Sequence, residues 1–533
     1  MNNQNKAIYP IIGTLLVAIG IMIGASLTRT ESFNDSIKIG SSYGQKLTDI
    51  IYVLDQEYVD EIDKKEIFEK TITNLLHDLD PHSNYIPAED LAELNESIQG
   101  RFGGVGIRFT IYDDTLNVVN VIEGSPAFNA GIKKFDQIIV VDGEEIANVG
   151  LTNEKVRSML KGEEGSPVEV TILRGEETFE KTIIRGSVPL ETVNAYYMLT
   201  EDIGYLKLSQ FSLQSAGEFY AALTQLKNQG MKNLVFDLRY NGGGVLGTAV
   251  SILEAFLDKG TPIVSTRGKN SPERTIYAET QTFMPDLGVA IIINGSSASA
   301  SEIVAGAIQD NDRGIIIGRR SFGKGLVQQD IALKDGSNLR LTVSRYYTPT
   351  GRGIQKPYSG DYHEYIMDEI NRYESGELYQ VDSTLMVDSL KFTTPKGKVV
   401  YGGGGIMPDI FVPLDTTGNS SYYRRLQYSG AFNEFAYQFA RFNDLNQYES
   451  IQEFDRKFTV SDQLLNEFTE YAKEKYDVNF NESQFKHSKE LIITSLKAEI
   501  ARQNWLELGA YYIFNKNDKE IKIAIEELQK GSN

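Results

Sequence analysis

The 533-residue sequence contains no cysteine, so it has no disulfide framework, no thiol nucleophile and no thiolate metal ligand. Histidine is scarce, with four in the chain, and no two of them lie with a carboxylate at metal-ligand spacing. We therefore expect no metal and no cofactor. Acidic residues outnumber basic ones by 73 to 53. The net charge of −20 argues against nucleic acid as a partner, because phosphate binding needs a basic surface.

Charged residues are also missing from residues 8–27, an apolar run near the N-terminus. About 20 such residues are enough to cross a bilayer. We predict an uncleaved, single-pass signal anchor within residues 1–30, in the cell (inner) membrane, with the bulk of the protein in the periplasm or otherwise outside the cytoplasm. A cleaved signal peptide is the alternative, because Gly24, Ala25 and Ser26 offer small residues for cleavage.

The remaining chain is too long for one hydrophobic core and predicts several domains. Two helices with apolar residues at helical spacing are expected between residues 47 and 79 and would form a small hairpin. Asp80-Pro81-His82-Ser83 follows as a turn. His77 and His82 invite a catalytic or metal role, but a histidine beside this turn is better interpreted as a hydrogen-bonded structural residue.

Residues 289–328 carry the strongest functional signal in the sequence. Their pattern predicts a strand, a turn, a helix, a second strand and a loop. A β-branched run over residues 289–293 predicts a buried strand, and Asn294-Gly295 ends it. Serines commonly cap helices, because a side-chain oxygen accepts an unpaired backbone N–H. Some of the four serines at the start of the helix are expected to do only this: Ser296, Ser297, Ser299 and Ser301.

A second interpretation of this stretch is nucleophilic catalysis. Lys324 lies between two glycines in the loop after the next strand, residues 314–318. A lysine removed from water has a lowered pKa and can accept a serine proton. Backbone N–H groups at a helix N-terminus can stabilise an oxyanion. A serine–lysine pair is thus a variant of the serine–histidine arrangement.

A glycine run, Gly242-Gly243-Gly244, follows another buried strand over residues 233–238. Glycines between a strand and a helix give backbone N–H groups access to a ligand. A nucleotide loop is the alternative, but the spacing fits neither a Rossmann nor a Walker loop. Asp237 and Arg239, just before the run, are expected to form an internal ion pair.

These motifs resemble the carboxyl-terminal processing peptidases, also called tail-specific proteases. The resemblance rests on Ser-Ala-Ser-Ala-Ser-Glu at 297–302, Ser-Phe-Gly-Lys-Gly at 321–325 and Asp-Leu-Arg-Tyr-Asn-Gly-Gly-Gly at 237–244, and it covers about residues 45–413. It implies that Ser299 is the nucleophile, that Lys324 is the base and that Gln328 assists the lysine. It also implies an oxyanion hole made by the N–H groups of Ala300 and of either Gly243 or Gly244.

Residues 100–186 resemble a PDZ domain of secreted bacterial proteases, with strands expected over 106–111, 116–121, 137–141 and 168–173. Gly104, Val105, Gly106 and Ile107 take the place of the carboxylate-binding loop. Backbone N–H groups of such a loop hold a terminal carboxylate while the peptide adds a strand to the sheet. A tight turn or β-bulge is the structural interpretation of the same glycines, and a nucleotide loop is not supported.

The amino-acid composition of the chain changes after Pro413. Amphipathic helices are expected over 461–476, 482–502 and 518–530, and His487 is expected on a helix surface. The family motifs do not reach this extension. It would pack on the protease core by default, and a dimer interface (a homo-oligomer) or the docking of an adaptor or other partner are the alternatives.

The predicted architecture is therefore a multidomain α/β (α+β) protein. It comprises an anchor (1–30), a helical N-terminal segment (31–99), an inserted PDZ-like β-rich domain (100–186), a protease core (187–413) and a helical extension (414–533). The resemblance implies a core with a mixed, ClpP/crotonase-like sheet. It also implies a serine endopeptidase that acts on peptides or proteins with free C-termini. A catalytically inactive, PDZ-type tail-binding scaffold is the alternative.

Overall fold

The computed structural model describes residues 42–531. The predicted signal anchor and the alternative cleavage site fall outside the described residues. The described residues divide into two compact units, with the boundary between Asn74 and Leu75. Within residues 42–531, no helix combines the length and the apolar character needed to span a bilayer.

The first unit contains helix α2, Ser42–Glu57, and most of helix α3, Lys64–His77. Both helices lie where the apolar spacing predicts them. A 2.8 Å salt bridge between Lys64 Nζ and Asp55 Oδ1 links α2 to the start of α3.

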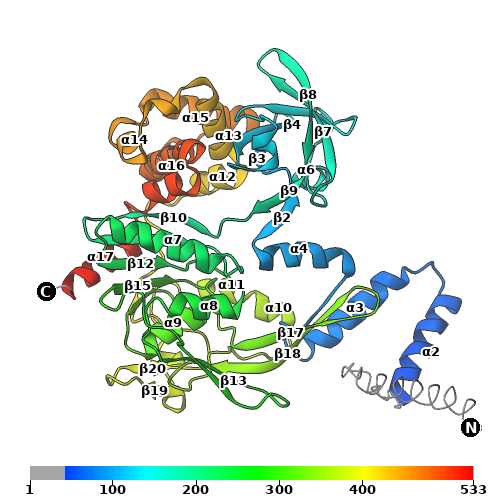
Figure 1. The fold of residues 1–533 in the computed structure, drawn as a ribbon, viewed down its shortest axis with the longest axis vertical. Coiled ribbons are helices and arrows are strands. Elements are labelled where there is room, and N and C mark those ends of the chain that lie inside the picture. The colour runs from blue at the N-terminus through cyan, green and yellow to red at the C-terminus, as the bar shows by residue number, and fades with distance from the viewer. Residues whose placement is uncertain (1–41, 532–533) are drawn as a thin grey trace, which may run out of the picture. The chain divides into compact units, whose positions relative to one another are not determined.

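A six-stranded sheet forms the centre of the second unit (Figure 1). Strand β10 is antiparallel to β11, and all other neighbours in the sheet are parallel. Every residue of β11 and β12 is buried, as expected for strands that are covered on both faces. In spatial order the strands are β10 (Val193–Met198), β11 (Ile203–Leu208), β12 (Asn233–Asp237), β15 (Gly288–Ile293), β16 (Ile315–Gly318) and β21 (Ile410–Phe411).

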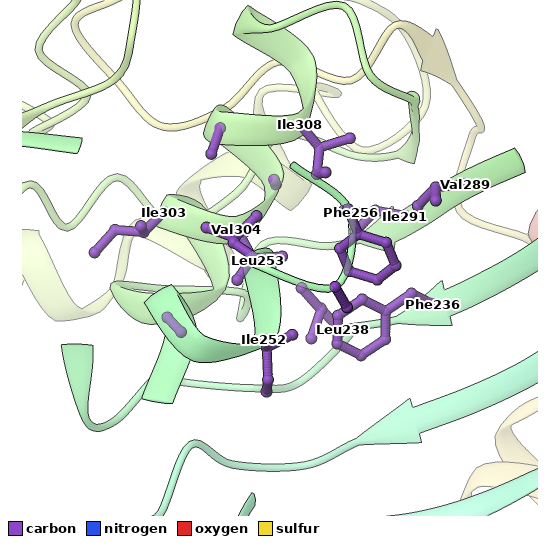
Figure 2. Packing of buried hydrophobic residues seen from close by; sticks show 14 of the residues in the cluster. Phe236, Leu238, Ile252, Leu253, Phe256, Val289, Ile291, Ile303, Val304 and Ile308 are labelled. Atoms are coloured by element: carbon purple, nitrogen blue, oxygen red, sulfur yellow. The ribbon is translucent and has the colours of Figure 1, made fainter. Parts of the chain in front are cut away.

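One face of this sheet packs against helices α7 (Ser215–Asn228), α8 (Leu246–Leu253) and α9 (Ala300–Asp310). Figure 2 shows Phe236 and Ile291, from neighbouring strands, close to Phe256. Burial of these apolar side chains, aromatic rings among them, stabilises this layer through the hydrophobic effect.

The opposite face is covered by helix α17, Lys519–Lys530. Strand residues that alternate with Phe236 and Ile291, namely Val235 and Ile292, point to this side. They pack with three residues of α17: Ile521, Ala524 and Leu528. Part of the C-terminal extension therefore belongs to the core around the central sheet.

A second sheet, antiparallel throughout, carries the residues that follow the Lys324 loop. Its strands are β1 (Asn84–Ile86), β13 (Pro262–Arg267), β14 (Arg274–Tyr277), β17 (Leu326–Ala332) and β18 (Asn338–Tyr347). The sequence predicts β18 but not β17, which has several polar and exposed residues. Two short helices, α10 (Tyr362–Ile366) and α11 (Asp368–Glu374), follow, and the pair β19 (Lys391–Thr393) and β20 (Val399–Tyr401) comes next.

The PDZ-like region folds around its own core. Its sheet runs in the order β3 (Ile107–Tyr112), β4 (Thr115–Val121), β5 (Gln137–Val141), β7 (Pro167–Arg174) and β8 (Glu177–Ile184), and β6 (Glu144–Glu145) pairs with β5. Helices α5 (Pro126–Asn129) and α6 (Asn153–Leu160) complete it. The entering and leaving chains pair as a ribbon of β2 (Arg101–Gly104) and β9 (Gly186–Pro189), next to helix α4 (Ala88–Gln99). The sequence misses β8, whose residues are mostly exposed and polar.

The rest of the extension forms helices α12 (Ser421–Ser429), α13 (Ala431–Phe442), α14 (Ile451–Lys457), α15 (Asp462–Tyr476) and α16 (Glu482–Phe514) around a third core. It contacts the PDZ-like region through Tyr437 Oη, which donates to Asn117 Oδ1, and through a salt bridge of Lys475 to Asp113. Helix α16 continues past Arg502, where the prediction ended it. The helix is kinked at Leu506, where φ is 52°.

Candidate active site

Ser299 lies at the junction between the turn after β15 and the start of α9. Its φ is +55° and its ψ is −113°, a conformation that costs a non-glycine residue roughly 1–3 kcal/mol. The Glu302 carboxylate accepts the backbone N–H of Ser299 at 2.8 Å. This strained, supported position is typical of a residue that is presented for a function.

The neighbouring serines have structural contacts, as their N-terminal position on a helix suggests. Ser297 Oγ donates to the carbonyl of Leu238 at 2.8 Å, and Ser301 Oγ donates to the carbonyl of Asn241 at 2.8 Å. Both serines are buried, whereas Ser299 is partly exposed. The buried serines therefore join the Ser299 turn to the glycine-rich loop after β12.

Gly243 brings that loop against Ser299. A Cβ on Gly243 would lie 2.7 Å from Ser299 Cβ and 2.9 Å from Ala300 N, and φ at Gly243 is +101°, so only glycine fits. The Gly243 N–H donates to Asn241 Oδ1 at 2.9 Å. Within the described part of the chain, the N–H groups of Ala300 and Gly244 have no hydrogen-bond acceptor. The Ala300 N–H, which follows Ser299, and the Gly244 N–H, which follows Gly243, are therefore available as donors for an oxyanion.

The Lys324 loop is fixed by the same carboxylate. Glu302 is fully buried and accepts Ser321 Oγ at 2.5 Å, Gly323 N at 2.6 Å and Lys324 N at 2.8 Å, in addition to Ser299 N. Burial raises the pKa of Glu302, and these hydrogen bonds oppose that rise. One side chain therefore positions the backbones of Ser299 and Lys324 together.

The surroundings of Lys324 lower the pKa of its amine. Burial is the largest cause of its lowered pKa, and the charge of Arg340 adds to the effect, while Glu302 and Asp80 oppose it. Among the residues that the structure describes, no carboxylate forms a salt bridge with Lys324 Nζ. A lowered pKa is the direction of change that favours a lysine as a general base.

Gln328 belongs to a polar chain beside the loop. Its Nε2 donates to Thr342 Oγ1 at 3.3 Å, and Thr342 Oγ1 donates to Asp80 Oδ1 at 3.0 Å. Asp80 also accepts the N–H of His82, which confirms the predicted turn. Burial lowers the pKa of His82 to about 3, and its Nε2 lies 3.0 Å from Tyr365 Oη. His82 is therefore a neutral, hydrogen-bonded residue at physiological pH.

Three residues that support the Ser299 and Lys324 segments were not predicted from the sequence. Tyr346 Oη donates to the carbonyls of both Ser299 and Lys324. Buried Arg372, on α11, donates to the carbonyls of Ser321 and Phe322. Glu302 had a usable signal, because Ser-x-x-Glu at the start of a helix is a capping-box pattern.

The ion pair predicted between Asp237 and Arg239 is present, with Arg239 Nη2 2.6 Å from Asp237 Oδ2. Lys207 and the hydroxyl of Tyr205 also contact this buried carboxylate. The pair fixes the turn that leads from β12 into the glycine-rich loop.

A cavity of about 320 Å³ lies between the predicted carboxylate-binding loop of the PDZ-like region and helix α4, which contributes Glu93, Glu96 and Ser97 to its wall. Val105, Gly106 and Ile107 line it, but Gly104 does not: it belongs to β2 and packs on the ring of Phe102. Apolar side chains form much of the remaining wall: Phe102, Phe109, Leu160 and Leu190. Such a cavity suits an apolar side chain next to backbone donors.

Comparison with known proteins places these features in a family. Peptidase family S41 matches residues 202–362, the PDZ domain matches residues 103–184, and a family of unknown function matches residues 422–506. A carboxy-terminal-processing protease of Bartonella bacilliformis is 38% identical over 357 residues, which cover 66% of this chain and 80% of that protein. The carboxy-terminal processing protease CtpB of Bacillus subtilis is 34% identical over 309 residues, covering 57% and 64%.

Among solved structures, a photosystem II D1 C-terminal processing protease is 28% identical, with a TM-score of 0.34, and covers 59% of this chain and 91% of that one. The sequence matches define a serine-type peptidase with a PDZ domain. The chain belongs to peptidase family S41, together with the carboxy-terminal-processing proteases. The predicted family and the multidomain α/β fold class are thereby confirmed.

Proposed function

We propose that this protein is a membrane-anchored, extracytoplasmic endopeptidase that captures C-terminal tails in its PDZ domain and cleaves them with Ser299 and Lys324. The observation that carries the catalytic part is the shared support of these two residues by buried Glu302. The lowered pKa of Lys324 agrees with this assignment.

In the proposed reaction, neutral Lys324 accepts the proton of the Ser299 hydroxyl while Oγ attacks the scissile carbonyl carbon. The N–H of Ala300 and that of Gly244 stabilise the oxyanion, since the Gly243 N–H is already used by Asn241. Lys324 then donates its proton to the leaving amine, and water hydrolyses the acyl-enzyme. Gln328 orients the lysine.

Substrate capture would use the PDZ groove. Backbone N–H groups near Val105–Ile107 would hold the tail carboxylate, and the cavity walls would take an apolar last residue. Ile107→Asp should weaken binding of a fluorescent tail peptide and raise KM, and kcat should stay close to wild type. Unchanged peptide binding would contradict this role.

The catalytic assignment is tested with purified Ser299→Ala and Lys324→Ala proteins. Both should lose peptide cleavage, keep the circular dichroism spectrum and keep tail binding. Labelling by a fluorophosphonate should need both residues, although serine–lysine enzymes can react slowly with this probe. Cleavage by pure Ser299→Ala protein would refute the assignment, and a wild-type protein that binds tails without cleaving any would favour the scaffold alternative.

Membrane anchoring rests on the apolar run over residues 8–27. The full chain should fractionate with membranes and resist extraction by salt and carbonate. A version that lacks these residues should be released. Release of the full chain by carbonate would contradict an uncleaved anchor.

A further inference from the structure

Two acidic residues at the start of α17 face the active-site end of the central sheet. Asp518 caps the helix, with Oδ1 accepting the N–H groups of Glu520 at 2.8 Å and of Ile521 at 3.1 Å. The Glu520 side chain is only 7% exposed. Because α17 packs on the sheet, neither carboxylate is free to move away with a flexible tail.

Glu520 binds two arginines with its two oxygens. Oε1 accepts Arg319 Nη1 at 2.6 Å, and Oε2 accepts Arg239 Nη1. Asp518 Oδ2 accepts the same Arg239 nitrogen at 2.6 Å. Both guanidinium groups are nearly buried, with 11% and 12% of their side chains exposed. A buried guanidinium that loses its carboxylate is strongly unfavourable, so these contacts restrain the arginines.

The two arginines begin the two loops that flank Ser299. Arg239 follows β12 and precedes the glycine-rich loop, while Arg319 follows β16 and precedes the Lys324 loop. Strand β15, which leads to Ser299, lies between β12 and β16 in the sheet. Glu520 therefore connects the loop of the oxyanion donors to the loop of the base, across the end of the nucleophile's strand.

Glu520 also lies close to the backbone at the start of the Lys324 loop. Gly318, the last residue of β16, has φ +118°, and a Cβ there would lie 3.5 Å from Glu520 Oε1 and 2.2 Å from the carbonyl oxygen of Ile293. Arg319 also donates to the carbonyl of Val412 at 3.2 Å. The geometry of the loop start is thus set by Glu520 and by the neighbouring strands.

We propose that Glu520, assisted by Asp518, is a positioning residue for peptide cleavage: the C-terminal extension holds the oxyanion loop and the lysine loop in their working arrangement. The extension thereby acts on the chemical step as well as on stability. This inference rests on the proposed function of Ser299 and Lys324.

The test compares Glu520→Gln with Glu526→Gln in the full chain. Glu526 is exposed on the same helix, so the control makes the same change of charge without touching the loops. A displacement of about 1 Å in a catalytic group can cost on the order of 100-fold in rate. We expect kcat of Glu520→Gln to fall about 10- to 100-fold, with KM and tail-peptide affinity within twofold of wild type and a matching decrease in the rate of fluorophosphonate labelling.

A second variant separates positioning from stability. Arg319→Met with Glu520→Met removes both members of the Arg319–Glu520 pair, while Arg239 keeps Asp518 and Asp237 as partners. Removal of both members of a buried pair costs less stability than removal of one. We expect its melting temperature to recover above that of Glu520→Gln while kcat stays low. Recovery of kcat in step with the melting temperature would overturn the proposal, and so would a wild-type kcat in Glu520→Gln. Cleavage by Ser299→Ala protein would instead overturn the underlying function.

Discussion

The carboxylate of Glu302 accepts the backbone N–H of Ser299 at 2.8 Å, at the point where Ser299 takes a positive φ. The same carboxylate accepts three donors from the lysine loop. The unusual backbone of the candidate nucleophile and the position of the candidate base therefore depend on one side chain that touches no solvent.

Replacement of Glu302 by glutamine should separate these loops. An amide has one acceptor oxygen for four donors, and its own NH₂ faces N–H groups. Each buried donor left unpaired costs about 1–3 kcal/mol. We expect Glu302→Gln to lose activity at least 100-fold, roughly the effect of a 1 Å displacement, and to lower the free energy of unfolding. Urea unfolding and peptide cleavage measure both, with exposed Glu490→Gln as the control. Full activity in Glu302→Gln would contradict the role of this carboxylate.

Activity should rise with pH as Lys324 loses its proton. Burial and Arg340 lower the pKa of Lys324 from its ordinary value, so the neutral base is present at lower pH than for an exposed lysine. The value of kcat/KM should increase up to this pKa and level off above it. Arg340→Gln should move the inflection to higher pH, because a positive neighbour is removed. The exposed Arg345 on the same strand supplies a control, Arg345→Gln. A shift to lower pH in Arg340→Gln would be inconsistent with this account.

His82 should make the protein sensitive to acid. Its folded-state pKa of about 3 lies below the ordinary value, so the unfolded state binds the extra proton as the pH falls below about 6.5. Stability is therefore present above that pH and is lost progressively toward pH 3. Between pH 7 and pH 4.5 this loss amounts to about 2–3 kcal/mol. In His82→Gln, urea unfolding should show a smaller loss over the same range, whereas exposed His487→Gln should behave like wild type.

A pair of glycine substitutions tests the close approach of the oxyanion loop. Gly243→Ala would place a Cβ 2.7 Å from the carbonyl oxygen of Ala298, at a positive φ. We expect it to abolish cleavage and to lower the melting temperature. Gly247→Ala, in helix α8, meets no atom within 4 Å and should be neutral or stabilising by up to about 1 kcal/mol. Equal activities of the two variants would show that the close packing of Gly243 against the Ser299 turn is not needed for cleavage.

Local patterns predicted the elements that carry the site. The apolar runs before Asn294 and before Asp237 became β15 and β12, and the serines became the start of α9. The ion pair of Asp237 with Arg239 spans two residues and was accessible in the same way. Each of these features is set by neighbours in the chain, which periodicity and turn chemistry describe well.

Contacts between distant segments could not be predicted. Arg239 meets Asp518 across 279 positions, and Arg372 meets the Phe322 loop from a helix with no family motif. Strand β17 has an exposed, mixed sequence after Gln328, so its pairing with β18 is not visible in the apolar pattern. Hydrophobic patterns identify which faces are buried, but they do not say which partner covers them.

The β2–β9 ribbon places the two ends of the PDZ domain side by side, with Gly104 opposite Gly186. A segment whose ends already adjoin can be replaced by another of different length without stretching the scaffold. A graft would need to keep this stem and the partners of Tyr437 and Lys475. Tail preference could thus diverge among relatives while the hydrolytic machinery is inherited unchanged.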